Sequence, residues 1–418
     1  MSRKTTSLTQ RNFDRFGHYG LNTGPTDEFG DVEQIPADIK NIGWTLGNDC
    51  PYRCTHCYSM QARKKGADMS LLMIERIVDQ LARNKVETVN LGGNEPIFTN
   101  GMDVRKTLLP DIIHQLTDKG IEVGLTTSGI TLLKLYENHR DAFHKLNDVD
   151  ISFDSPFEDE HNKNRGAKIY HQAIQAMEIC QKEDKPHSAI MCAMNWNFSL
   201  KHIDSLIDLA HSYSANVRIN ALKPTEPKHM ASALTPEQYY TGFARLLERC
   251  SPVDLGEPPL AAVTDYQDAK RCPCGRTSFR IHSITPEGQI HVSPCVYMHD
   301  YKSPLDLLEH DLIDIINSEQ FVVFRQRNAR PDMVRGCQGC TMLSGCGGGC
   351  AARAFLYNRN LTKEFSMLAK DPYCPKDVRP QDTFPQQPVL DGGQKLVHMD
   401  YLCTAIFNPM GKDQGLDK

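Results

Sequence analysis

The sequence predicts an α/β fold, a partial (β/α)6 TIM-like barrel followed by a cysteine-rich domain. Two patterns predict it: six short apolar runs alternate with helical stretches in the first half of the chain, and most of the 15 cysteines lie in tight groups. Alternating strands and helices form parallel β/α units. Six units are too few to close an eightfold barrel, so we expect a partial barrel with its site at the carboxyl ends of the strands.

The barrel is predicted over residues 39–234, after a polar and irregular lead-in over 1–38. Between its strands, apolar residues recur three and four apart, as in helices that pack one face on a sheet. The strands are predicted at 42–46, 86–91, 121–126, 149–153, 188–194 and 217–222, and the helices at about 71–81, 103–119, 167–183 and 199–211.

A helix over 235–250 is predicted to bridge the barrel and the second domain. Thr235 is a good N-cap, Pro236 suits the first helical position and Gln238 completes a capping box. Residues 251–380 are rich in Cys, Gly and Pro, which favours a domain held by metal more than by an apolar core. The tail over 381–418 contains an apolar stretch at 401–407 that we expect to dock on the protein.

Composition and charge exclude several classes of protein. Lys plus Arg number 47 against 52 for Asp plus Glu, a net charge of −5, so we expect no nucleic-acid or membrane partner. No apolar run approaches the roughly 18 residues of a membrane helix, and no signal peptide is visible, which favours a cytoplasmic location. An odd number of cysteines in a long chain without a secretion signal argues against a disulfide scaffold.

The first cysteine group directly follows the first predicted strand. Cys50, Cys54 and Cys57 have the spacing C-x3-C-x2-C. Three thiolates on one loop can hold three irons of a cubane cluster and leave the fourth iron open for a substrate or cosubstrate. A structural zinc site needs four ligands, and His56 could supply the fourth only with awkward geometry.

This loop resembles the signature of the radical SAM superfamily, whose C-x3-C-x2-C lies after the first strand of a partial β/α barrel. The resemblance implies that Cys50, Cys54 and Cys57 bind a [4Fe–4S] cluster whose open iron takes S-adenosylmethionine (SAM). It also implies that one electron cleaves SAM to a 5′-deoxyadenosyl radical, which abstracts hydrogen from the substrate. The electron would come from a reductant such as flavodoxin or ferredoxin.

Candidate SAM contacts lie at later strand ends. The segment 92–96, Gly-Gly-Asn-Glu-Pro, resembles the family's GGEP, which meets the amino group of SAM; the additional Asn leaves open whether Asn94 or Glu95 makes that contact. A plain turn or local strand-end hydrogen bonds are the alternative. By the same resemblance, the candidate SAM-binding residues are Gly92, Gly93, Asn94, Glu95, Ser128, Ser152 and Asn195, and Asp154, His161 and Glu95 are candidates for proton removal.

The remaining cysteine groups resemble the SPASM domain, whose C-x2-C-x5-C-x3-C segment is reproduced at 337–350. The resemblance implies two auxiliary [4Fe–4S] clusters. The nearer one would be held by Cys272, Cys274, Cys295 and Cys350, and the outer one by Cys337, Cys340, Cys346 and Cys374. Because one residue separates the first two of these cysteines, Cys272 could ligate or could leave an iron open. Four cysteines are left over and are expected to be buried thiols: Cys180, Cys192, Cys250 and Cys403.

SPASM-bearing radical SAM enzymes mostly modify ribosomally made peptides. The resemblance therefore implies a maturase that installs a crosslink, a thioether or a backbone excision in a precursor peptide. In anaerobic sulfatase maturases an acidic residue follows the auxiliary-cluster cysteine, whereas Val296 stands there, which argues against that activity. The residues before the first strand are too few for the leader-binding module of several such maturases, so a separate leader-binding protein is expected.

Two other classes stay open. One is a radical SAM dehydrogenase or decarboxylase that acts on a small molecule in natural-product biosynthesis, a group that more often has one auxiliary cluster. The other is a non-enzymatic iron–sulfur or zinc scaffold, which would not cleave SAM. Iron per chain separates the two enzyme classes, because three cubanes hold about twelve irons and two hold about eight.

Overall fold

The computed structural model describes residues 37–60, 66–264, 271–378, 384, 393–397, 399–401 and 403–409. Nearly all of the expected lead-in and much of the expected tail lie outside these residues. Within the described residues, no helix is both long enough and apolar enough to cross a membrane.

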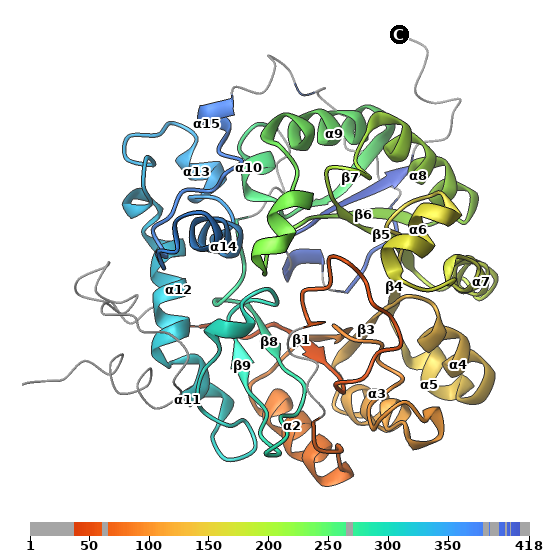
Figure 1. The fold of residues 1–418 in the computed structure, drawn as a ribbon. Coiled ribbons are helices and arrows are strands. Elements are labelled where there is room, and N and C mark those ends of the chain that lie inside the picture. Colours follow the sequence, from red (N-terminus) through yellow and green to blue (C-terminus); the bar gives the residue numbers. More distant parts are fainter. Residues whose placement is uncertain are drawn as a thin grey trace, which may run out of the picture.

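Six parallel strands form the centre of one mixed sheet (Figure 1). Each pairs in parallel with the next along the chain, as expected for consecutive β/α units. They are β1 (Asn41–Thr45), β2 (Thr88–Gly92), β3 (Glu122–Thr127), β4 (Asp148–Ser152), β5 (His187–Ala193) and β6 (Asn216–Ala221). These bounds agree with the predicted runs to within two residues. The predicted fold class, a partial β/α barrel followed by a cysteine-rich region, is confirmed.

Four further strands extend the sheet on both sides. β8 (Ser278–Ile281) pairs in parallel with β1, and β9 (Val292–Ser293) pairs antiparallel with β8. On the other side, β10 (Ala405–Pro409) lies antiparallel between β6 and β7 (Cys250–Leu255). The sequence predicted only that the apolar stretch near the C-terminus docks; in the structure it is a strand of the central sheet.

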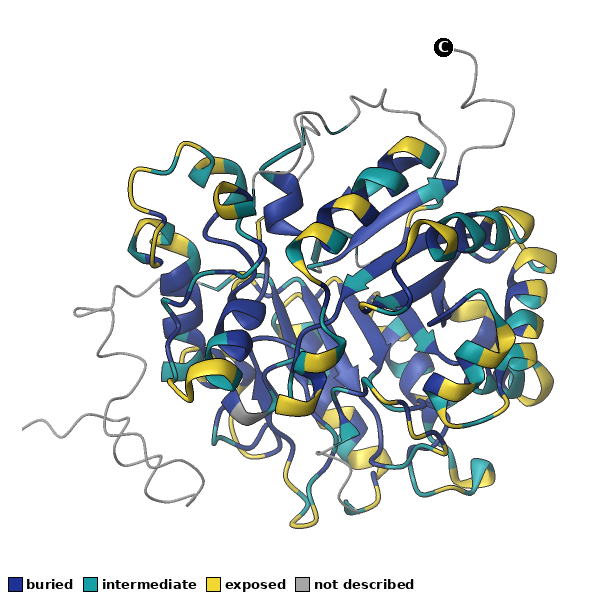
Figure 2. Cartoon of the chain, turned by 45° about the horizontal axis from the view of Figure 1, so that its top comes forward, coloured by how far each residue is buried: buried dark blue, intermediate teal, exposed yellow. Residues whose placement is uncertain are grey.

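Helices cover the outer face of the sheet, and the cysteine-rich segment lies along the side of β8 and β9 (Figure 1). Figure 2 shows the strands as buried and the exposed residues mainly on the outward faces of the helices. In the barrel the helices are α2 (Leu71–Arg83), α3 (Leu109–Asp118), α4 (Ile130–Asn138), α5 (Arg140–Lys145), α6 (Glu158–Arg165), α7 (Tyr170–Lys182), α8 (Leu200–Ser212) and α9 (Pro236–Arg249). In the later part they are α10 (Pro258–Ala261), α11 (Leu312–Ile316), α12 (Glu319–Ala329), α13 (Leu343–Cys346), α14 (Ala351–Thr362) and α15 (Pro375–Val378).

Local sequence explains where several helices begin. Ser70 caps α2 by accepting a hydrogen bond from the backbone of Met73 at 3.3 Å, and the helix buries Ile74 and Leu81 against the sheet. Thr235 and Gln238 form the predicted capping box at the start of α9. Short 3-10 turns occur at Val104–Lys106, Pro227–Ser232, His299–Tyr301, Pro331–Met333 and Met399–Tyr401.

Candidate active site

The first cysteine loop follows β1 and rests on the end of α6. Cys54 and Cys57 are buried with Tyr52 in a small cluster against which the partly buried Cys50 packs. Two backbone hydrogen bonds fix the loop, from Arg53 N to the carbonyl of residue 165 at 3.1 Å and from Thr55 N to that of residue 164 at 3.0 Å. The three thiols are therefore gathered by a loop that the barrel holds in place.

A buried ion pair stands behind this loop. Arg165 Nε lies 2.6 Å from Asp154 Oδ2, and Arg165 Nη1 lies 3.8 Å from the Cys54 sulfur. Burial raises the pKa of the Cys54 thiol to about 11. Burial opposes ionisation of Asp154 as well, but the adjacent Arg165 holds the pKa of Asp154 below its usual range. Since its carboxylate is engaged by Arg165, Asp154 is a poor candidate for a general base and instead positions the loop.

Glu95 connects the ends of β2 and β3. Its carboxylate accepts hydrogen bonds from Ser128 Oγ at 2.6 Å, from Thr131 Oγ1 at 2.7 Å and from the Thr127 hydroxyl. Its side chain is 3 % exposed, so these hydroxyls replace the water that it loses on burial. Asn94 is fixed separately, because its Nδ2 donates to the Gly47 carbonyl at 2.9 Å and its Oδ1 accepts from Ser59 at 3.0 Å.

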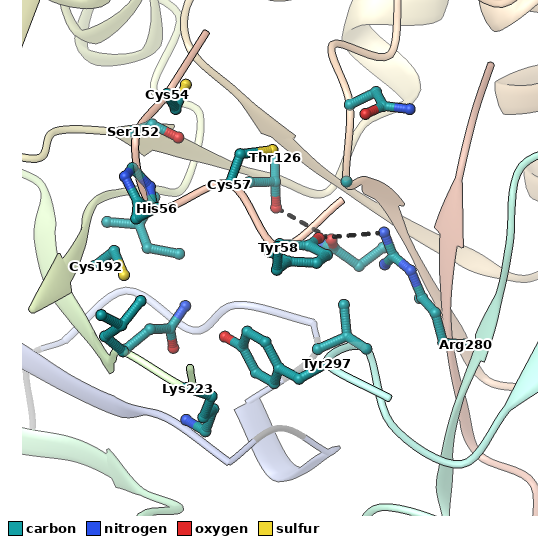
Figure 3. Close-up of a pocket in the computed structure, with 18 of the residues that line it drawn as sticks. Cys54, His56, Cys57, Tyr58, Thr126, Ser152, Cys192, Lys223, Arg280 and Tyr297 are labelled. Carbon is teal, nitrogen blue, oxygen red and sulfur yellow. Dashed lines mark hydrogen bonds between the residues drawn. The ribbon is translucent and has the colours of Figure 1, made fainter. Parts of the chain in front are cut away.

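A cavity of about 220 Å³ opens at the carboxyl ends of the parallel strands. In Figure 3 the first cysteine loop lies on one side, Lys223 and Tyr297 lie across from it, and Arg280 reaches in from β8. Of the predicted residues, those that line it are Cys50, Cys54, Cys57, Gly93, Asn94, Glu95, Ser128, Ser152, Asp154, Cys274, Cys295 and Cys350. The cavity thus extends from the first cysteine loop to three cysteines of the second domain.

Two of the predicted SAM contacts lie elsewhere. Gly92 ends β2 and does not line the cavity, and Asn195 is exposed, with its Nδ2 donating to the Ala231 carbonyl at 2.8 Å. The buried polar residue after β5 is Asn197 instead, which donates to the Asp154 carbonyl at 2.6 Å. His161 is also fully buried, packs on Phe153 and accepts from Asp154 N at 3.3 Å, which gives it a structural place behind the site.

The cysteines expected at the nearer auxiliary cluster come together in the structure. Cys272, Cys274, Cys295 and Cys350 are buried in one cluster of side chains. The Cys274 thiol lies in hydrogen-bond contact with Cys272 and Cys295. Tyr297, two residues after Cys295, turns into the cavity, and its ring lies 5.3 Å from that of Tyr58 on the first cysteine loop.

The cysteines expected at the outer cluster form a second set. Cys337 and Cys346 each have Cys374 as an electrostatic neighbour, and Cys340 adjoins Cys337. Arg327 is fully buried and has as neighbours Cys272 and Cys350 of the nearer set and Cys337 of the outer set. Its Nε donates to the Met367 carbonyl at 2.7 Å. A buried guanidinium between two thiolate sets offsets their negative charge.

Of the four left-over cysteines, two lie where they were expected and two do not. Cys180 and Cys250 belong to the main apolar core. Cys192, expected to be a plain buried thiol, lines the cavity, and Cys403, placed by the sequence in the tail, contacts the nearer auxiliary set. Neither position could be predicted from spacing, because each depends on which strand lies beside which.

A chain of buried charges connects the barrel to the second domain. Arg353 on α14 pairs with Glu257 at 2.8 Å and with Asp371 at 2.9 Å, and Lys223 lies 3.2 Å from Glu257. Asp371 Oδ2 also accepts from the backbone N–H of Cys350 at 2.7 Å. This network fixes Cys350 relative to the end of β6.

Among the residues that the structure describes, four cationic side chains line the cavity. Three of them are paired with buried carboxylates: Arg165 with Asp154, Arg218 with Asp150, and Lys223 with Glu257. Among the described residues Arg280 has no carboxylate partner; its Nε donates to Thr45 Oγ1 at 2.8 Å and its Nη2 lies 3.5 Å from the Tyr58 hydroxyl. The only sequence signal for it is a charged residue between Phe279 and Ile281 in a buried strand.

The donor sets fit iron–sulfur clusters by their chemistry. All fifteen cysteines are free thiols, and each of the three sets consists of sulfur donors only. Within the described residues, no group of three or more His, Cys, Asp or Glu is placed to hold a single metal ion. In a cubane each thiolate binds a different iron, so its thiolates need not converge on one point.

A three-thiol loop at a strand end, beside a cavity that also reaches a second thiol set, is the donor arrangement of an iron–sulfur protein. The chain belongs to the radical SAM superfamily and carries a C-terminal SPASM domain. The family model described as "Radical SAM superfamily" matches residues 44–210, and the SPASM model, described as "Iron-sulfur cluster-binding domain", matches residues 272–341. The protein is thus a radical SAM enzyme with a SAM-binding [4Fe–4S] cluster and auxiliary iron–sulfur clusters.

The similar proteins include named maturases. The chain is 25% identical over 329 residues to the "Mycofactocin maturase MftC" of Mycobacterium ulcerans, which covers 75% of this chain and 83% of the relative. An "Uncharacterized protein" of Archaeoglobus fulgidus is 25% identical to this chain over 354 residues, which cover 82% of this chain and 80% of the relative.

Two solved structures have a similar fold. "Native anSMEcpe with bound AdoMet and Kp18Cys peptide" gives a TM-score of 0.58 at 15% identity over 81% of this chain and 95% of that one. The structure of Streptococcus suis SuiB bound to precursor peptide SuiA gives a TM-score of 0.55 at 16% identity, over 81% of this chain and 76% of that one. At these identities the likeness concerns the fold.

Proposed function

We propose that the protein is a peptide maturase that uses SAM to abstract hydrogen from a ribosomally made peptide and so installs a crosslink, a thioether or a backbone excision. The observation that carries the proposal is the single cavity lined both by the first cysteine loop and by Cys274, Cys295 and Cys350. A substrate in this cavity would lie between the site of radical formation and an auxiliary cluster.

The relatives support a peptide as the substrate. The relative of this chain in Mycobacterium ulcerans is named a maturase, and the solved structures of similar fold contain a precursor peptide in one case and a short peptide in another. The proposed partners are a precursor peptide, a reductant such as flavodoxin or ferredoxin and, if a leader is recognised, a separate leader-binding protein.

Each part of the cavity has a proposed task. Cys50, Cys54 and Cys57 would hold the [4Fe–4S] cluster, which with SAM supplies the 5′-deoxyadenosyl radical. The Gly93–Glu95 segment, Ser128 and Ser152 would bind SAM, since they line the cavity beside the cysteine loop. Glu95 orients this segment by holding the β3 loop, because its oxygens already accept hydrogen bonds from Ser128 and Thr131.

Arg280 is proposed to bind the substrate. It is 4 % exposed, its neighbours are Tyr58, Tyr297 and Cys295, and it has no carboxylate partner among the described residues. A buried guanidinium is costly unless a ligand or protein group offsets its charge. A carboxylate or a peptide carbonyl of the substrate is the group that would do so.

The experiment uses the anaerobically reconstituted full-length enzyme with SAM, dithionite and the short peptides encoded beside its gene. We expect release of 5′-deoxyadenosine together with a mass change in one peptide. The Cys54→Ala variant should abolish both, whereas Cys180→Ala, which removes a thiol of the apolar core, should retain both. Release of 5′-deoxyadenosine with every peptide unchanged, accompanied by conversion of a small molecule, would contradict the peptide proposal and favour a dehydrogenase or decarboxylase.

A further inference from the structure

The nearer auxiliary site contains five thiols, one more than a cubane cluster needs. Cys403, from the segment before β10, has Cys272 and Cys350 as its nearest thiol neighbours. It packs on the same buried cluster of side chains that contains Cys272, Cys274, Cys295 and Cys350. Since a cubane has four irons and takes one protein thiolate on each, one of the five is surplus.

The backbone around Cys403 is fixed by the central sheet. The next residue, Thr404, is 1 % exposed; its hydroxyl donates to the Ile219 carbonyl at 3.0 Å and its carbonyl accepts from Gly256 N at 2.8 Å. Ala405 then pairs with strands on both sides. The backbone beside the thiol is thus held by β6 and β7, strands of the central sheet.

The cavity distinguishes the five thiols. Cys274, Cys295, Cys350 and Cys403 line it, whereas Cys272 does not. Only one residue separates Cys272 from Cys274, so if both were ligands, three consecutive residues would have to supply thiolates to two irons of one cluster. Cys403 carries no such restriction, because it comes from the segment before β10, remote in sequence from Cys274, and is a neighbour of Cys350.

We propose that Cys403 is a ligand of the nearer auxiliary cluster, together with Cys274, Cys295 and Cys350, and that Cys272 is a non-ligating thiol beside Cys403. The cluster then has four protein ligands and no open iron. It accepts or passes electrons next to the substrate and does not bind the substrate through iron. The C-terminal strand becomes part of the cofactor site.

The test is spectroscopic and needs no substrate, so its failure is distinguishable from a failure of the peptide proposal. Full-length protein carrying Cys50→Ala, Cys54→Ala and Cys57→Ala is used as background, so that the signals come from the auxiliary clusters. Three variants are made in this background, each with one further substitution: Cys403→Ala, Cys272→Ala and, as the matched control, Cys180→Ala. Iron content, EPR of the reduced protein and the effect of added cyanide are measured for each.

We expect Cys403→Ala to have one of two effects. Either the protein loses about four irons, those of one cubane, or the EPR g-values shift and the cluster responds to cyanide. Cys272→Ala and Cys180→Ala should leave iron content and spectrum as in the background. Cys403→Ser, which keeps the side chain's size and polarity, should also shift the g-values, which guards against a folding effect of the alanine. Unchanged spectra for both Cys403 variants, or an equal change for Cys272→Ala, would overturn the assignment.

Discussion

Arg280 places a guanidinium beside Tyr58 and Tyr297, at the boundary between the barrel and the second domain. The other described cations that line the cavity are paired with carboxylates of the protein, so their charges are offset without a ligand. Arg280 differs because its described hydrogen-bond partners are neutral hydroxyls. This difference is the basis for assigning it to the substrate.

Arg280→Met should weaken substrate binding while SAM cleavage without substrate persists. A hydrogen bond to a charged group contributes about 1.5–3 kcal/mol, which corresponds to a roughly 10- to 100-fold rise in the KM for the peptide. The measurement is 5′-deoxyadenosine release with and without peptide. Arg276→Met, which changes an exposed arginine of the same segment, is the control and should behave as the unmodified enzyme. An equal loss of SAM binding would assign Arg280 to the cosubstrate instead.

His161 should make stability depend on pH. Burial lowers its pKa to about 4, whereas the same residue in the unfolded chain titrates near 6.5. Between these values the unfolded chain binds a proton that the folded protein does not, so the free energy of unfolding falls as the pH is lowered, by about 3 kcal/mol in all.

Denaturant unfolding between pH 4 and 7 measures this dependence. His161→Gln should reduce the slope of the free energy of unfolding against pH by an amount that corresponds to nearly one bound proton over that range. A His161→Gln slope equal to that of the unmodified protein would show that His161 does not titrate as the burial predicts.

At the scale of elements, the sequence located what depends on local pattern and missed what depends on remote pairing. The six parallel strands agree with the predicted runs because apolar periodicity reports burial directly. β10 was not predicted as a strand, since its partners β6 and β7 lie some 150 residues or more away along the chain. The contact of Cys403 with Cys350 was missed for the same reason.

The candidate site shows the same division. Spacing placed the first three cysteines on one loop, and the resemblance to the SPASM domain assigned Cys272, Cys274, Cys295 and Cys350 to one set, which the structure brings together. Spacing could not show that Asn195 points away from the cavity and that Asn197, two residues on, is the buried one. A shift of two residues in a loop after a strand has no periodic signature.

The turn after β2 depends on a glycine. Gly93 has φ +95°, and a Cβ there would lie 2.3 Å from Arg280 Nη2 and 2.6 Å from Thr45 Oγ1. Gly93→Ala should therefore combine backbone strain with displacement of Arg280. Gly101→Ala is a matched control, because Gly101 has φ +77° but no atom within 4 Å of its Cβ position.

We expect Gly93→Ala to lower the free energy of unfolding by about 1–3 kcal/mol more than Gly101→Ala does. It should also weaken SAM binding, which Gly101→Ala should not. Thermal unfolding and SAM titration of the two variants measure both effects. Equal destabilisation by the two substitutions would mean that only the positive φ matters and that the close approach to Arg280 does not.

At the scale of the whole molecule, a buried ionic network joins the two halves of the chain. Arg353 is 0 % exposed and serves both Glu257, after β7, and Asp371, which holds the backbone of Cys350. The backbone of Cys350 is therefore fixed relative to the end of β6 by buried charges of the protein.

Arg353→Met should lower the free energy of unfolding by about 3–5 kcal/mol, because it leaves the buried Asp371 carboxylate without its cation and Glu257 with Lys223 alone. It should also reduce iron bound at the auxiliary sites, since Cys350 loses its anchor. Arg335→Met removes a solvent-exposed arginine. It should change the free energy of unfolding by no more than a few tenths of a kcal/mol and should leave the bound iron unchanged. Retention of stability and of iron in Arg353→Met would show that the network does not position Cys350.

The central claim is that a peptide occupies the cavity between the first cysteine loop and the nearer auxiliary cluster and gives up a hydrogen atom there. Transfer of deuterium tests it most directly. The precursor peptide, produced in fully deuterated form, is incubated with enzyme, SAM and dithionite, and the 5′-deoxyadenosine is analysed by mass spectrometry. We predict 5′-deoxyadenosine that carries one deuterium from the peptide and a peptide of altered mass. Unlabelled 5′-deoxyadenosine beside an unchanged peptide would contradict the account.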